Sequence, residues 1–116
     1  MVLATGSRPQ IPLVPGLEAT PFWTNRQAVS VKELPASLLV LGGGAIGVEP
    51  AQAFARFGTA VTVVEAMQHL LPAEEPAVGT LLADVLEDEG ILGRPGPDAD
   101  HRAMPKFTFT DPRSAP

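Results

Sequence analysis

A glycine-rich turn between two apolar runs constrains the fold more than any other feature of the sequence. The run Leu38–Leu41 leads directly into Gly42–Gly47, and a second run, Ala60–Val64, lies further along the chain. A continuous apolar run bounded by glycine or proline is typical of a parallel strand that is buried on both faces. Between the runs, apolar residues recur at helical spacing, and Gly58 stands where a helix C-cap is expected. The sequence therefore predicts an α/β fold built on a strand–helix–strand unit with parallel strands.

Three glycines of the turn, Gly42, Gly44 and Gly47, have the spacing G-x-G-x-x-G. In a turn that binds a dinucleotide, the first glycine allows the tight bend, the second lets the backbone approach the pyrophosphate, and the third lets the helix pack on the strand. The N–H groups and the dipole of the helix N-terminus add a site for the phosphates. We therefore predict a partial Rossmann-type unit whose cofactor-binding residues include Gly42, Gly43, Gly44, Ala45, Ile46 and Gly47. A loop that needs glycine only for its backbone conformation is the alternative.

Glu65 ends the second predicted strand, roughly 20 residues beyond the glycine turn. A carboxylate at this place accepts hydrogen bonds from the ribose hydroxyls of NAD and repels the 2′-phosphate of NADP. The sequence therefore predicts a dinucleotide as the partner, with NAD preferred over NADP. A solvated charge at the end of a strand is the alternative for Glu65.

The segments outside this unit give less regular patterns. Residues 76–89 place apolar side chains on one stripe, which predicts a surface helix ended by Gly90. From Leu92 the periodicity stops, so an irregular, proline- and glycine-rich tail is expected. Within this tail, residues 106–110 alternate like a strand, and a loose segment is the alternative there.

Thr24 and Gln27 have the spacing of a capping box, which predicts one helical turn. The residues before them, 1–21, are punctuated by proline and are expected to form a strand end and an extended linker.

The composition excludes several classes of function. The net charge of −5 gives no basic surface for nucleic acid or for an anionic membrane, so neither is an expected partner. The sequence contains no cysteine, which excludes disulfides, thiolate metal sites and a cysteine nucleophile on this chain. His69 and His101 have no neighbours at metal-ligand spacing, so no metal site and no catalytic residue is assigned. The N-terminal segment resembles neither a signal peptide nor a membrane span, so the cytoplasm is the expected location.

Three motifs in this order resemble the pyridine nucleotide-disulfide oxidoreductase family, the flavoenzymes that include dihydrolipoamide dehydrogenase and mercuric reductase. The motifs are Ala4–Pro9, Gly42–Glu49 and Val61–Glu65, and the resemblance covers residues 3–91. It implies FAD and NAD(P) as cofactors and the passage of hydride between nicotinamide and flavin. It also implies that Thr5 and Gly6 contact the flavin cofactor. Glu49 matches a family acid that lies near the nicotinamide, and an exposed helix carboxylate is the alternative.

The chain also departs from the pattern of this family. Pro50 stands where the family has an apolar residue, and its cost is small only if the helix begins at Ile46 or Gly47. The family's cysteine pair and first FAD glycine motif have no counterpart, and the pattern is lost after Ile91. Residues 106–110 then resemble the opening of the family's dimerisation domain. These departures predict a truncated and internally deleted copy.

Three ranges follow from this resemblance. Residues 1–21 are expected to be the end of an FAD domain with its linker, residues 22–91 a partial NAD-binding Rossmann domain, and residues 92–116 an irregular tail. The expected function is the NAD(H)-binding segment of an FAD/NAD-dependent oxidoreductase, with no catalysis by the isolated chain. A flavin-carrying polypeptide or a homodimer partner would then complete the enzyme. A non-catalytic dinucleotide-binding module and an inert remnant are the alternatives.

Overall fold

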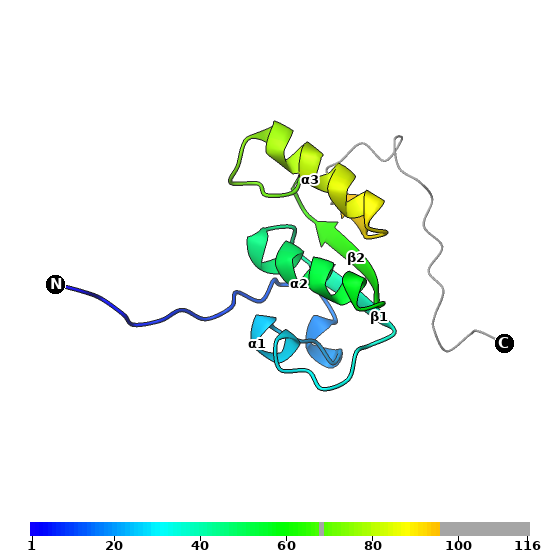
Figure 1. Ribbon diagram of the computed structural model, residues 1–116. Coiled ribbons are helices and arrows are strands. Elements are labelled where there is room, and N and C mark those ends of the chain that lie inside the picture. Colours follow the sequence, from blue (N-terminus) through cyan, green and yellow to red (C-terminus); the bar gives the residue numbers. More distant parts are fainter. Residues whose placement is uncertain (68, 96–116) are drawn as a thin grey trace. The chain divides into compact units, whose positions relative to one another are not determined.

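The chain divides into two compact units, and each is described by itself. The computed structural model describes residues 1–67 and 69–95 (Figure 1). The first unit is Met1–Val31, and the second begins at Lys32. The boundary predicted after residue 21 therefore falls inside the first unit, and the predicted strand at 106–110 lies outside the described residues.

The first unit contains a 3-10 turn at Leu17–Ala19 (η1) and a short helix at Asn25–Ala28 (α1). The side chain of Thr24 accepts a hydrogen bond from the N–H of Arg26 at 3.3 Å. In return, the side chain of Gln27 accepts one from the N–H of Thr24 at 2.9 Å. This reciprocal pair is the predicted capping box, and it satisfies N–H groups that the short helix itself leaves unpaired.

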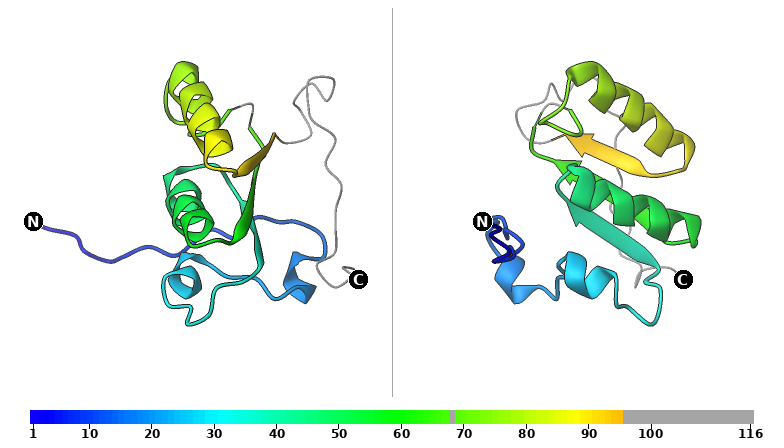
Figure 2. Two further views of the ribbon diagram at one scale, coloured as in Figure 1. Left: turned by 45° about the vertical axis from the view of Figure 1, so that its right-hand side comes forward. Right: turned by 60° about the vertical axis from the view of Figure 1, so that its left-hand side comes forward.

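The described part of the second unit is a three-stranded parallel sheet with two helices. In chain order its elements are β1 (Ser37–Leu41), α2 (Ala45–Arg56), β2 (Ala60–Glu65), α3 (Pro76–Asp88) and β3 (Leu92–Pro95). The strands lie in the order β1-β2-β3, and α2 and α3 lie on the same face of the sheet (Figure 2, left). The predicted α/β fold with parallel strands is confirmed, and its pattern is that of a Rossmann-like unit.

Strand β3 corrects the prediction that the chain is irregular from Leu92 onward. Its register pairs Thr62 with Leu92 and Glu65 with Pro95, so this segment continues the sheet beside β2. Its sequence, Leu-Gly-Arg-Pro, contains two residues that strands disfavour, which hides the strand from a search for side-chain patterns. Proline is tolerated because Pro95 ends a strand at the edge of the sheet. The Rossmann-like unit therefore extends past the predicted limit at Ile91.

The helices cover only one face of the sheet among the described residues. Val40 lies on the covered face, because its Cγ1 is 3.2 Å from the position that a Cβ would take on Gly47 of α2. Successive side chains of a strand alternate between faces, so Leu39 and Leu41 point away from α2, and they are 54% and 42% exposed. The prediction that this strand is buried on both faces is wrong. An unbroken apolar run shows what the side chains are, but it does not show that a second layer covers them.

The core fills the space between the covered sheet face and the two helices. Val63 on β2 and Ile91, just before β3, are the largest side chains that are fully buried. The other buried apolar residues are Val48, Ala51 and Phe54 of α2, Val61 of β2, Leu70, and Leu86 of α3. Removal of this apolar surface from water is the main favourable contribution to the stability of the unit.

Both helices of the second unit end at a glycine, as the sequence predicted. In each case the glycine and the residue after it donate hydrogen bonds to carbonyls of the last helical turn, which is the Schellman arrangement. The pairs are Gly58 to Ala55 (2.9 Å) and Thr59 to Phe54 (3.0 Å) after α2, and Gly90 to Glu87 (2.9 Å) and Ile91 to Leu86 (2.8 Å) after α3. These two ends fix the points at which the chain leaves the helices for β2 and β3.

Pro50 lies further inside α2 than the sequence interpretation assumed. The helix begins at Ala45, not at Ile46 or Gly47, so Pro50 is its sixth residue and lies beyond the first turn. Proline has no N–H, so the carbonyl of Ile46 loses its usual partner four residues on, at a cost of up to ~3 kcal/mol. The next residue, Ala51, is fully buried in the core. Packing of this helix face offsets the missing hydrogen bond.

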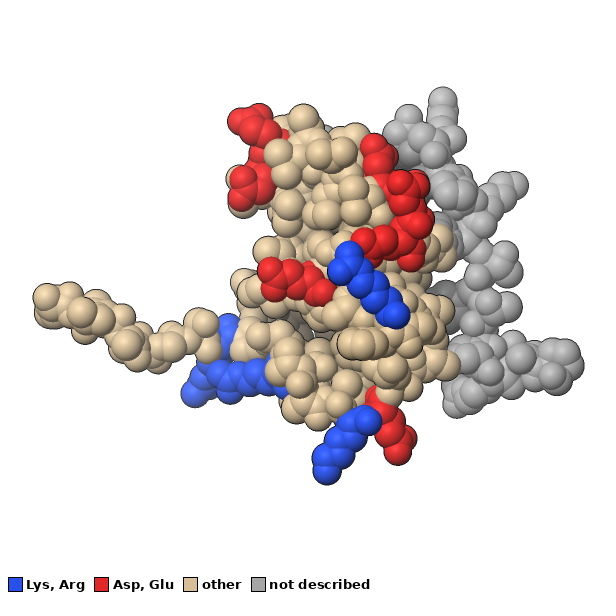
Figure 3. Space-filling view, viewed as in Figure 1, with Lys and Arg blue, Asp and Glu red and all other residues tan. Residues whose placement is uncertain are grey.

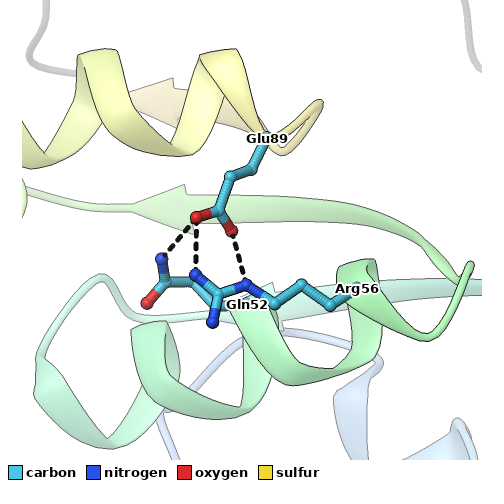
Figure 4. A network of polar contacts seen from close by, with 3 residues as sticks. All are labelled: Gln52, Arg56 and Glu89. Carbon is cyan, nitrogen blue, oxygen red and sulfur yellow. Dashed lines mark hydrogen bonds and ion pairs between the residues drawn. The ribbon is translucent and has the colours of Figure 1, made fainter.

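An ion pair joins the C-terminal ends of α2 and α3 (Figure 4). Arg56 Nη2 lies 2.7 Å from Glu89 Oε1, and Gln52 Nε2 donates to the same oxygen at 3.2 Å. Helix α3 has no basic residue in its last turn, and acidic side chains gather over it on the face seen in Figure 3. A carboxylate near a helix C-terminus is repelled by the helix dipole. Arg56 therefore supplies the cation that α3 itself lacks.

No helix in the described part of the chain is long and apolar enough to cross a membrane.

Substitution of Ile91 tests whether the segment leading into β3 belongs to the core. Because Ile91 is fully buried, we expect Ile91→Val to lower the free energy of unfolding by about 1 kcal/mol in urea titrations. The matched control is Ile11→Val at a site that is 49% exposed, where we expect a change within about 0.5 kcal/mol. Equal effects of the two variants would contradict the core position of Ile91.

The ion pair predicts a pH-dependent contribution to stability. The hydrogen bond from Arg56 is the main cause that holds the pKa of Glu89 below its ordinary value. A carboxylate whose pKa is lowered by folding stabilises the fold above its ordinary pKa, and this contribution is lost as the pH falls through the lowered pKa. We therefore expect Glu89→Gln to lower the urea midpoint at about pH 7, and to differ less from the unchanged protein at about pH 3 than at about pH 7.

Asp84→Asn is the control for this measurement, because it removes a carboxylate of α3 that makes no ion pair among the described residues. We expect its urea midpoint to follow that of the unchanged protein closely at both pH values. A difference for Glu89→Gln that is as large at about pH 3 as at about pH 7 would show that the ion pair is not its source.

Candidate functional site

The chain bends sharply where β1 passes into the glycine turn. Gly42 has φ 105°, in the left-handed region that only glycine adopts without strain. Its N–H donates to the carbonyl of Val64 at 2.8 Å, which continues the pairing of β1 with β2 by one residue. The first glycine of the motif therefore serves the tight bend that the sequence predicted.

Gly43 is held by residues that follow β2. Its N–H donates to Glu65 Oε2 at 2.7 Å, and its carbonyl accepts from the N–H of Leu71 at 2.9 Å. A Cβ at this position would clash with Leu70 Cδ2 and would lie 3.1 Å from Glu65 Oε2. Gly43 is buried, and its own N–H and its own carbonyl are both used inside the protein, so neither is presented to a ligand.

Gly44 is the open position of the turn. It is the N-cap of α2, and a Cβ built on it would meet no atom within 4 Å. Its carbonyl accepts from the N–H groups of Gly47 and Val48, each at 3.0 Å. Among the described residues, the N–H groups of Gly44, Ala45 and Ile46 donate to nothing, and the side chains of Ala45 and Ile46 are exposed. Three free N–H groups at the positive end of a helix can bind an anion.

Gly47 lies where α2 packs most closely on the turn. A Cβ there would clash with the carbonyl oxygen of Gly42 and would lie 3.2 Å from Val40 Cγ1. The structure therefore gives the third glycine the close packing of helix on strand that the motif predicts.

Glu65 is buried at the end of β2, with 8% of its surface exposed. Besides the bond from Gly43, its Oε1 accepts from the N–H of Met67 at 2.8 Å. The alternative of a solvated charge at the strand end is wrong, because Glu65 is buried. The two hydrogen bonds provide the donors that a buried carboxylate needs. Each carboxylate oxygen has two lone pairs, so Glu65 retains capacity to accept hydroxyl groups of a ligand.

The remaining predicted site residues do not join this cluster. Glu49 lies on α2 with an exposed side chain, so the alternative of an exposed helix carboxylate describes its position. Thr5 and Gly6 belong to the first unit, where both are exposed and Gly6 has φ 75°. Their contact with a flavin stays a prediction.

The sequence interpretation missed the part played by His69–Leu71. Leu70 packs over Gly43, and Leu71 is the only described residue other than glycine with a positive φ, at 50°. A leucine pair before Pro72 carries no pattern that signals such a role. Within residues 1–67 and 69–95, no group of three or more metal-ligating side chains lies together, His69 included.

The fold and the glycine turn form a Rossmann-like unit that resembles the FAD/NAD-binding domain of flavoprotein disulfide reductases. A copper complex of the HOCl-induced flavoprotein disulfide reductase RclA from Escherichia coli superposes with a TM-score of 0.72 and 36% identity, over 84% of this chain and 24% of that one. The water-forming NADH oxidase from Lactobacillus brevis, bound to NADH, superposes with a TM-score of 0.63 and 28% identity, over 79% of this chain and 22% of that one.

The sequence comparisons give the family. The profile of the family described as pyridine nucleotide-disulphide oxidoreductase matches residues 1–100. Dihydrolipoyl dehydrogenase from Chlorobaculum tepidum is 43% identical over 106 residues, which are 90% of this chain and 22% of that protein. Mercuric reductase from Shewanella putrefaciens is 43% identical over 91 residues, which are 78% of this chain and 16% of that protein. The chain belongs to the pyridine nucleotide-disulphide oxidoreductase family, and it spans about a fifth of the length of these relatives.

The different surroundings of Gly47 and Gly44 predict different effects of the same substitution. We expect Gly47→Ala to lower the free energy of unfolding by about 1–3 kcal/mol, because its methyl group would meet backbone that has no room to move. Gly44→Ala adds the same methyl group to open space at φ −75° and should change stability by less than about 0.5 kcal/mol. Urea titrations measure both. A destabilised Gly44→Ala would mean that Gly44 is packed against the protein itself.

Proposed function

We propose that the second unit binds the ADP half of NAD(H), as the dinucleotide-binding part of an FAD/NAD(P)-dependent redox protein. The observation that carries this proposal is the contrast between Gly44 and its neighbours. The positions of Gly43 and Gly47 are filled by the protein, whereas the space in front of Gly44 is open. A ligand group that approaches the backbone closely would occupy this space.

The pyrophosphate fits the first turn of α2. The N–H groups of Gly44, Ala45 and Ile46 have no acceptor in the described part of the chain, and the helix dipole favours negative charge there. These groups bind phosphate without a basic side chain. A chain with a net charge of −5 can therefore bind phosphate at this helix end although it has no basic surface.

Glu65 supports a preference for NAD over NADP. Its carboxylate lies beside the turn and would accept hydroxyls of the adenosine ribose, whereas a 2′-phosphate there would bring two negative charges together. The Lactobacillus brevis oxidase is bound to NADH, and an engineered form of it was solved with NADPH. The engineered form replaces a run of aspartate, alanine and methionine by alanine, arginine and serine. In this chain β2 ends in Glu65 and continues with Ala66-Met67, an acidic residue followed by alanine and methionine, as in the run of the unmodified oxidase.

In such a protein, flavin bound near the nicotinamide supplies the chemistry of hydride transfer. The part of this chain is to hold the dinucleotide, and Glu49, exposed on α2, is the residue that would lie toward the nicotinamide. The sequence has no cysteine, so it carries no cysteine pair of its own to receive electrons. The missing cysteine pair favours a second candidate function for the chain by itself, which is to bind the dinucleotide without a redox reaction. A flavin-carrying polypeptide or a second copy would supply the rest.

Calorimetric titration with NADH and with NADPH tests the proposed function. We expect the protein to bind NADH, to bind NADPH at least about tenfold more weakly, and to lose both in Gly44→Val, whose side chain fills the space for the pyrophosphate. A folded protein that gives no heat with either dinucleotide would contradict the proposal.

Two further variants test which positions determine the binding of the dinucleotide and the preference for NADH. Gly93→Val is the matched control, because Gly93 also has open space around its Cβ position but lies on β3, away from the turn in sequence, and binding should be unchanged. Glu65→Gln removes the negative charge, but its single amide oxygen cannot accept from both Gly43 and Met67, so we expect weaker binding of NADH together with a smaller preference for NADH over NADPH. Absorbance of a bound flavin in the purified protein separates the redox function from binding alone.

A further inference from the structure

We propose that residues His69–Leu71 form a positioning segment, which sets the direction of the Gly44 N–H and is itself held in place by Gly79 of α3. The inference rests on the proposed function, because the Gly44 N–H matters only if it faces the phosphates of a dinucleotide. Helix α3 contributes no residue to the predicted site. According to this inference, it nevertheless supports the site through Gly79.

The first step is the hydrogen bond from the N–H of Leu71 to the carbonyl of Gly43, at 2.9 Å. This carbonyl and the N–H of Gly44 belong to the same planar peptide group. In a trans peptide the two bonds point in opposite directions, and the described part of the chain has no cis peptide. Leu71 therefore aims the Gly44 N–H away from the positioning segment and toward the open side of the turn.

The peptide group on the other side of Gly43 is fixed as well. Its N–H donates to Glu65 Oε2 at 2.7 Å, in a buried hydrogen bond. Leu70, only 8% exposed, covers Gly43 so closely that a Cβ there would clash with its Cδ2. With both peptide groups held, the backbone at Gly43 has little freedom to turn the next N–H elsewhere.

The positioning segment is itself kept in an unfavourable conformation. Leu71 has φ 50°, and its carbonyl accepts from the N–H of Glu74 at 2.8 Å. A leucine with positive φ persists only where surrounding contacts impose it. The segment therefore depends on its neighbours, and a small displacement of those neighbours is transmitted to it.

Gly79 is the neighbour that holds the segment from the side of α3. The three atoms nearest to a Cβ on Gly79 all belong to the segment: Leu70 O, with which it would clash, His69 Nδ1 at 2.9 Å and His69 Cβ at 3.2 Å. The backbone of α3 thus packs directly on the segment, and only glycine leaves room for this approach. A methyl group added at Gly79 must push the segment and, through Leu71, change the direction of the Gly44 N–H.

The test is Gly79→Ala in the full chain, titrated with NADH and NADPH. We expect the dissociation constants of both dinucleotides to rise by the same factor, about tenfold, because the phosphates that meet Gly44 are common to both. The preference for NADH, which depends on Glu65, should stay unchanged. We also expect the amide signal of Gly44 in a ¹⁵N–¹H correlation spectrum to move. Gly93→Ala adds the same methyl group to open space and should leave binding and the Gly44 signal unaltered.

The outcomes separate the positioning inference from the proposed function. If the unchanged protein binds neither dinucleotide, the proposed function is wrong, and with it the inference that rests on it. If the unchanged protein binds NADH and Gly79→Ala binds it as tightly, with the Gly44 signal unmoved, only the inference is wrong. If Gly79→Ala does not fold, the inference is tested by amide hydrogen exchange in the unchanged protein. A Leu71 amide protected more than that of Gly44 supports the inference, and an unprotected Leu71 amide overturns it.

Discussion

The hydrogen bond between the Gly43 N–H and the carboxylate of Glu65 is the interaction on which the candidate site depends. It joins the turn that follows β1 to the end of β2, at 2.7 Å and in a buried position. A hydrogen bond to a charged acceptor is stronger than one between neutral groups, and a buried carboxylate is costly without such donors. The buried carboxylate of Glu65 therefore depends on the N–H donor of the turn, and the backbone of the turn is in return held by this carboxylate. Glu65 is proposed to accept hydrogen bonds from the ribose hydroxyls. It also fixes the backbone of the turn that is proposed to hold the phosphates.

The parts of the fold that the sequence predicted are those in which local pattern and structure coincide. The glycine turn, the helix ends at Gly58 and Gly90 and the apolar run of β2 each depend on residues close together in the chain. Strand β3 was missed because pairing with β2 forms it, while its own residues include Gly93 and Pro95. The exposure of Leu39 was missed for a related reason, since a strand sequence does not reveal how many layers surround it.

The candidate site shows the same limit at the level of single residues. The motif assigned tasks to Gly42, Gly44 and Gly47, and the geometry around them fits those tasks. It assigned Gly43 only to the cofactor, whereas the structure shows Gly43 enclosed by Glu65 and Leu70. Contacts of this kind join residues far apart in sequence and follow no spacing rule, so they become visible only when the chain is folded.

The contacts that shape the turn all fall within one continuous stretch of chain, from Val40 to Gly79. Two residues of the buried core, Leu86 and Ile91, nevertheless lie beyond this stretch. Because domains generally fold as units, we expect the turn to take its final shape only together with α3 and β3. A chain that ended at Gly79 would contain every contact of the turn and would still lack part of the core that supports it.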